Sequence, residues 1–125
     1  MAQSVPYVPR AEAVVTSLSP RFDEEGTFRW QERLRQHLAE GNMVHVIDVD
    51  GVDLLSAPML RFLVAVLRMV RDRGGAVGLV ATRENALRTL AVTGLDHVFS
   101  VGRTVSEVTA LMDAGAIALR SKKAR

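Results

Sequence analysis

Three carboxylates lie close together in the middle of the chain: Asp48, Asp50 and Asp53. Carboxylate oxygens at such short spacing could bind a divalent cation. A calcium-binding loop also needs a glycine at its sixth position and a terminal glutamate, and this segment has neither. Because aspartate at a strand end commonly caps a turn, we interpret the three carboxylates as turn residues and expect no metal site.

The three histidines, His37, His45 and His97, fall on a predicted helix, strand and loop. No serine–histidine–aspartate arrangement links them, so we expect structural or surface roles. The chain has no P-loop and no dinucleotide-binding glycine motif. It also has no cysteine, which excludes disulfides, thiolate catalysis and thiolate metal sites. We therefore expect a protein that is not an enzyme and that binds no cofactor.

Ser56 directly precedes an apolar segment that has Pro58 in its first turn. Its hydroxyl is suited to capping a helix N-terminus, which is the plainer interpretation. The alternative is a phosphoacceptor, because a phosphate there would meet free backbone N–H groups and the positive end of the helix dipole. The phosphate would place nearly two negative charges beside an apolar surface and could eject a docked partner.

The elements that must position these residues follow from hydrophobic periodicity. Strands are predicted over 12–18, 43–49, 76–81 and 98–101, and helices over 28–40, 57–73, 84–92 and from 105. This alternation is typical of a mostly parallel sheet with crossover helices. We therefore expect an α/β fold with a central sheet of about four to five strands and about four helices. The domain would span 11–114, between a flexible arm at 1–10 and a basic, disordered tail at 115–125.

Local signals indicate where several elements begin and end. Residues 22–27 are predicted to form a loop, and Gly74 with Gly75 should end the helix before them by a left-handed turn. Thr82 is expected to cap the helix over 84–92. Thr104 and Glu107 have the spacing of a capping box, which predicts the start of the last helix.

Composition limits the partners that the chain could have. Of 125 residues, 48% are hydrophobic and 24% are charged, which suits one domain with its own core. The formal net charge is only +2, and basic residues crowd the C-terminal end, so we expect no nucleic-acid partner. Since no signal segment and no membrane-spanning run occur, we expect a cytoplasmic protein without direct membrane insertion.

The helix over 57–73 is unusually apolar. Its polar stripe consists of Arg61, Arg68 and Asp72, and nearly every other position through Val70 is apolar. Such a helix must cover the sheet and contact something else as well.

From the strand that ends at Asp48, the chain resembles the STAS domain family, the fold of anti-sigma factor antagonists in bacterial stress and sporulation pathways. In that family a polar-Gly-Val turn follows the strand, and Asp-Ser-Ser-Gly-Leu opens a long helix that Gly-Gly closes. Here the turn is Asp50-Gly51-Val52 and the closing pair is Gly74-Gly75. Counted without a gap, Ser56 falls on the family's Asp and Ala57 on its phosphorylated Ser.

Other positions extend the resemblance. Met59 replaces the family's Gly, Leu60 matches its Leu, and Thr93-Gly94-Leu95 matches the Ser/Thr-Gly-Leu before the last strand. Asp23 falls on an acidic residue that the family places near its phosphoserine, although Pro20 replaces the usual preceding Gly.

The resemblance implies a STAS fold and a protein partner, typically an anti-sigma factor with serine kinase activity. Phosphorylation normally switches this binding off, but Ala57 cannot be phosphorylated, and Ser56 could serve instead only through a one-residue shift. The implied role is signal transduction in transcription regulation and stress response. The expected partner-binding residues are Asp23, Asp50, Gly51, Val52, Asp53, Ser56, Ala57, Pro58, Met59, Leu60 and Arg61.

Two other functions stay open. STAS domains also form scaffolds by self-association or serve as accessory subunits of transport systems, and the apolar helix would suit such an interface, in a homodimer or a larger assembly. Some bind nucleotides or other small ligands. We rank that function last, because the sequence shows no nucleotide site.

Overall fold

The computed structural model describes residues 13–123, so the arm predicted at 1–10 lies outside the described residues. It confirms an α/β fold in which strands alternate with helices, with four strands and four α-helices among the described residues. The elements in order are β1 (Val14–Ser17), α1 (Glu24–Ala39), β2 (Val44–Asp48), α2 (Ala57–Asp72), β3 (Ala76–Val80), α3 (Glu84–Thr93), the 3-10 turn η1 (Leu95–His97), β4 (Ser100–Gly102) and α4 (Val105–Lys123).

The four strands form one parallel sheet in the order β1-β2-β3-β4. The central pair, β2 and β3, is in register from Val44 beside Ala76 to Asp48 beside Val80. Because a central strand is covered on both faces, both strands need apolar residues throughout. Ile47 and Leu79 are accordingly buried.

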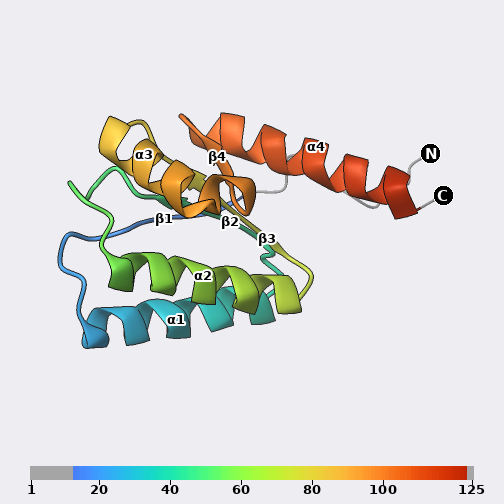
Figure 1. Ribbon diagram of the computed structural model, residues 1–125. Coiled ribbons are helices and arrows are strands. Elements are labelled where there is room, and N and C mark those ends of the chain that lie inside the picture. The colour runs from blue at the N-terminus through green and yellow to red at the C-terminus, as the bar shows by residue number, and fades with distance from the viewer. Residues whose placement is uncertain (1–12, 124–125) are drawn as a thin grey trace.

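Helices cover both faces of the sheet (Figure 1). Helices α1 and α2 lie on one face, where their buried side chains join those of the sheet in the larger core. Helix α4 lies on the other face, where Val108 and Met112 pack against Val46 and Val80. Helix α3 adds Ala86 to the larger core. The carboxyl ends of all four strands therefore meet at one edge of a three-layer domain.

Helix α2 forms as the sequence predicts. Ser56 is its N-cap, with the hydroxyl accepting from the Met59 N–H at 3.4 Å, and a proline stands in the first turn. Gly74 ends the helix with φ of 84°, and a Cβ on Gly75 would lie 2.4 Å from the carbonyl oxygen of Met43. The inner face buries Met59, Phe62, Leu63, Val66, Leu67 and Val70, which fixes α2 firmly against the sheet.

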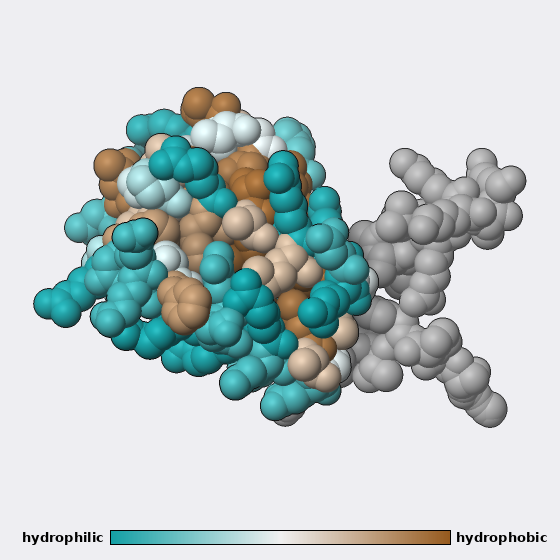
Figure 2. Space-filling model, turned by 90° about the horizontal axis from the view of Figure 1, so that it is seen from below, coloured by the Kyte–Doolittle hydropathy of each residue, from teal (hydrophilic) through white to brown (hydrophobic). Residues whose placement is uncertain are grey.

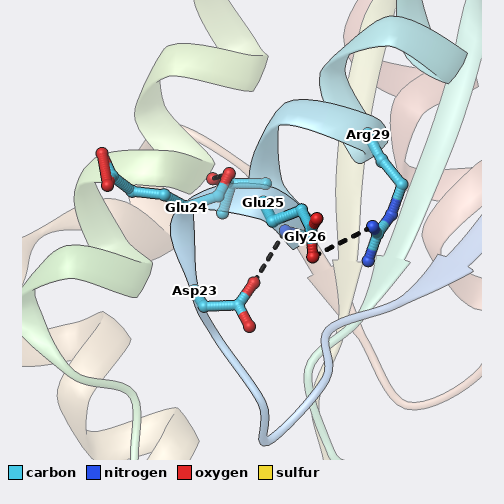
Figure 3. A network of polar contacts seen from close by, with 6 residues as sticks. Asp23, Glu24, Glu25, Gly26 and Arg29 are labelled. Atoms are coloured by element: carbon cyan, nitrogen blue, oxygen red, sulfur yellow. Dashed lines mark hydrogen bonds and ion pairs between the residues drawn. The ribbon is translucent and has the colours of Figure 1, made fainter.

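The predicted loop over 22–27 is wrong, because α1 begins at Glu24. The Asp23 carboxylate accepts a hydrogen bond from the Gly26 N–H at 2.7 Å and so caps the helix (Figure 3). Glu24 and Glu25 then occupy the first turn, where negative charge is favourable next to the helix N-terminus. A glycine at position 26 favours a loop in the sequence, but Gly26 lies within α1.

The C-terminal elements follow the local signals. Gly94 has φ of 77° and ends α3. The Thr104 hydroxyl accepts from the Glu107 N–H at 3.0 Å, as in a capping box. Helix α4 continues through Lys123 and so includes much of the segment 115–125 that the sequence predicts as a tail. The domain bounds of 11–114 stay a prediction. Among residues 13–123, no helix is long and apolar enough to cross a membrane.

Candidate functional site

The carboxyl edge of the sheet brings together two loops that are distant in sequence. One joins β2 to α2 and contains Asp50 and Asp53, and the other joins β3 to α3 and contains Thr82 and Arg83. Residues 50–61, together with Asp23, are called the edge surface below. They include every residue that the sequence analysis predicts to bind a partner.

Asp50 ties the two loops together. Its carboxylate accepts from the Thr82 N–H at 2.8 and 3.1 Å, from the Thr82 hydroxyl at 2.7 Å and from the Arg83 N–H at 3.3 Å. Burial opposes its ionisation, but the hydrogen bonds from Thr82 and Arg83 and the charge of Arg83 outweigh burial and lower the pKa of Asp50. The prediction that Thr82 caps α3 is wrong, because Arg83 is the N-cap residue and Thr82 binds Asp50.

The other two carboxylates of the acidic segment have partners of their own. Asp48 accepts from the Asp50 N–H at 2.8 Å, which confirms its role in a turn. Asp53 forms an ion pair with Arg83 at 2.6 Å, but its side chain is 96% exposed, so the pair adds little stability. Among the described residues, no group of three or more histidines, aspartates or glutamates could hold a metal ion.

The start of α2 exposes side chains without reactive groups. Ala57 and Pro58 are exposed, and Arg61 is exposed one turn further. Ser56 is half-buried, and its cap bond confirms the plainer interpretation of this residue. This part of the edge surface can therefore make contact with a partner.

Two of the predicted contact residues in the edge surface are buried. Val52 is 3% exposed and Met59 is 7% exposed, so both belong to the core. Leu54 was not predicted, yet its side chain is 65% exposed in the same loop. The adjacent pair Leu54-Leu55 indicates in the sequence that one leucine is exposed, because adjacent residues in a tight loop seldom both face the core. Here Leu55 is the buried residue of the pair.

Asp23 lies at the same edge, on the loop that leads from β1 to α1. The neighbouring Phe22 ring makes an edge-to-face contact with Phe62 of α2, with centroids 5.5 Å apart. Trp30 makes a similar contact with Phe62 at 5.2 Å. These aromatic contacts fix the α1 N-terminus against α2 and so place Asp23 on the side of the edge surface.

A hollow of about 440 Å³ opens beside Asp23, between the end of β1 and the first turns of α1. Arg21, Arg29 and Arg33 contribute cations to its lining, and Asp23 and Glu25 contribute carboxylates. Glu25 pairs with Arg29 at 3.3 Å (Figure 3). With charges of both signs, the lining does not define one class of ligand.

The histidines lie away from the acidic loop. His45, near the start of β2, is 2% exposed and donates from Nε2 to the Asn42 carbonyl oxygen at 2.7 Å. Burial lowers the pKa of His45; the hydrogen bond to Asn42 opposes this effect, and the nearby His37 adds to it. His45 is therefore a neutral core residue.

Comparison with protein families matches residues 10–108 to the STAS domain. No curated protein matches the chain.

Solved structures share this fold. A crystal structure of a candidate anti-sigma factor antagonist from Thermotoga maritima is 22% identical, with a TM-score of 0.58 over 74% of this chain and 76% of that one. An NMR structure of that protein is 20% identical, with a TM-score of 0.65 over 86% of this chain and 90% of that one. An anti-sigma factor antagonist from Mycobacterium paratuberculosis is 26% identical, with a TM-score of 0.61 over 78% of this chain and 86% of that one.

Proposed function

The chain belongs to the STAS domain family, and we propose that it is a non-catalytic interaction module that binds an anti-sigma factor through the edge surface. The observation that carries this proposal is the exposed start of α2, which follows a loop that Asp50 joins to Thr82. Apolar surface with few charges is typical of the centre of a protein interface. The similar protein from Mycobacterium paratuberculosis is an anti-sigma factor antagonist, and we place the function in the cytoplasm, in the regulation of transcription during stress.

We further propose that phosphorylation does not switch this binding off. Ala57 stands where the resemblance to the family places the phosphorylated serine, and an alanine has no hydroxyl to accept a phosphate. Ser56 is half-buried, and its hydroxyl oxygen already accepts from the Met59 N–H. Partial burial limits the access of a kinase to this hydroxyl, so we propose that Ser56 is not the acceptor in the folded chain.

The test restores the missing hydroxyl. The full chain and its Ala57→Ser variant are mixed with each purified anti-sigma factor kinase of the organism that encodes the chain. We expect both to bind one kinase without ATP. With ATP, only Ala57→Ser should gain a phosphate, measured by intact mass, and leave the complex. Ser56→Ala is the matched control for phosphorylation and, like the unaltered chain, should gain no phosphate with ATP.

The proposal fails on either of two results. One is a phosphate on the unaltered chain, which would make Ser56 an acceptor. The other is full binding by Ala57→Glu, because a carboxylate at the centre of the edge surface should disrupt an apolar contact. A stable assembly of this chain with itself, measured by analytical ultracentrifugation, would favour the scaffold function instead.

A further inference from the structure

Helix α2 forms one wall of a groove of about 420 Å³ that faces away from the core, and the turn after α3 forms the other wall. We call this the arginine groove; it is lined by Leu60, Arg61, Val64, Ala65, Arg68, Thr93 and Leu95. We propose that it binds an amphipathic helix of the protein partner that carries two acidic residues seven positions apart. This inference rests on the proposed function and adds the chemistry of the partner.

The floor of the arginine groove is apolar. Leu60 and Val64 are half-buried and one turn apart on α2, and Leu95 faces them from η1. Val92, next to the opposite wall, is 81% exposed. From the side of α1 and α2, apolar surface is visible between hydrophilic side chains (Figure 2). The apolar floor of the arginine groove can bury the apolar face of a second helix.

Two arginines flank this floor. Arg61 and Arg68 are both exposed, and seven residues of helix separate them by about 10 Å along its axis. Neither forms an ion pair with any residue in the described part of the chain. Three other helical arginines are paired with carboxylates, in the pairs Arg29–Glu25, Arg35–Glu32 and Arg88–Glu84. Arg71 instead donates to the Val98 carbonyl oxygen, and Arg33 forms no ion pair among the described residues.

The position of Arg61 supports a role in binding. It lies near the N-terminus of α2, where the helix dipole disfavours a cation, and the first turn of α2 has no acidic residue. Arg68 lies in the C-terminal half of α2, so only Arg61 acts together with the positive end of the dipole. An acidic residue of a partner would meet both.

Charge and apolarity together identify the occupant. A second copy of this chain, related by a two-fold axis, would bring the same arginines towards each other, and this repulsion disfavours a homodimer through the groove. A nucleic-acid backbone would satisfy the arginines but would leave Leu60 and Val64 without an apolar partner. A helix with an apolar face and acidic residues at i and i+7 satisfies both features.

The test uses the full chain as bait for a displayed library of random 16-residue peptides. We expect enriched peptides with apolar residues at helical spacing and an aspartate or glutamate seven positions from another. Binding of the best peptide should weaken roughly tenfold in the Arg61→Glu, Arg68→Glu double variant, because two exposed attractions become repulsions. It should also weaken as salt rises.

Two controls separate charge pairing from a loss of structure. Arg35→Glu changes a helical arginine on α1, outside the groove, and should bind the peptide unchanged. A peptide with lysines in place of both acidic residues should bind the double variant better than the unaltered chain. The proposal is overturned if no peptide is enriched, if acidic pairs are absent from the enriched peptides, or if the double variant binds them equally well.

The proposed function can fail separately. Arg61 belongs to both surfaces, whereas Arg68 lies in the arginine groove alone. If the anti-sigma factor binds and responds to Ala57→Glu but not to Arg68→Glu, the arginine groove is not part of the interface and the proposed function stands. If acidic peptides bind the groove as expected but no anti-sigma factor binds the chain, the proposed function is wrong and the inferred partner chemistry stands.

Discussion

Replacing Asp50 by alanine should loosen the edge surface and destabilise the domain measurably. The change removes the acceptor for three donors, which are the Thr82 N–H, the Thr82 hydroxyl and the Arg83 N–H. A hydrogen bond to a charged group is worth about 1.5–3 kcal/mol when it is shielded from water. These bonds are exposed, and water can replace the acceptor, so we assign about 0.5–1 kcal/mol to each and expect a total loss of about 2 kcal/mol.

The assay is urea unfolding of the full chain at pH 7, followed by circular dichroism. We expect a lower midpoint and an unchanged denaturant slope, because the surface buried by folding stays the same. Asp50→Asn should lose about half as much, roughly 1 kcal/mol, since it keeps one carbonyl acceptor but lacks the charge. In a double-mutant cycle with Thr82→Val, the two losses should not add, because both changes remove one shared bond.

The pH dependence gives an independent check. The pKa of Asp50 is lower in the folded chain than its ordinary value near 3.8, so its carboxylate contributes stability above that pH. The contribution disappears as the pH falls through the lowered pKa. The gap in stability between the unaltered chain and Asp50→Ala should therefore close in acid. A loss under about 0.5 kcal/mol at pH 7, or a gap that persists at low pH, would refute the assigned role.

Three further predictions concern the core and the start of α2. Gly78→Ala should destabilise the chain by about 1–3 kcal/mol in urea, because its Cβ would lie 2.2 Å from a methyl group of Val108; a loss near zero would mean that α4 shifts freely. His45 has a lowered pKa, so stability should fall as the pH drops below about 6.5, where the unfolded chain gains the proton first, and unfolding of His45→Gln should show a weaker fall between pH 7.5 and 5.5. Ser56→Ala should cost only about 0.5 kcal/mol, since its cap bond is long at 3.4 Å, and a loss of several kcal/mol would indicate another role.

The fold was predictable because its central elements have strong local patterns. β2 and β3 are apolar runs bounded by turns, and α2 combines a serine cap with a long apolar stretch. The start of α1 was not predicted, since Asp23 and Gly26 resemble a loop until their hydrogen bond is seen. Thr82 was assigned to the wrong partner because Asp50 is 32 residues away in sequence.

The candidate site was predictable in place but not in detail. The carboxyl end of β2 and the start of α2 follow from the order of elements and from the resemblance. The burial of Val52 could not be predicted, because a short loop has no periodicity that defines an inner face. Met59 differs, because it lies on α2 three and four residues before the buried Phe62 and Leu63, and this helical spacing favours burial. The arginine groove was missed for a related reason: it forms only where Leu95 comes to lie beside α2, a tertiary contact that the sequence pattern of α2 does not contain.

The central claim is that this chain binds an anti-sigma factor through an edge surface that phosphorylation does not switch off. Its most direct test is recovery of the tagged full chain from native cell extract, beside Ala57→Glu as the matched bait, with mass spectrometry of the bound proteins and of the intact bait. We predict an ATP-binding anti-sigma factor with the unaltered chain, none with Ala57→Glu, and an unmodified bait mass. The same proteins on both baits, or a phosphate on the unaltered chain, would contradict the claim.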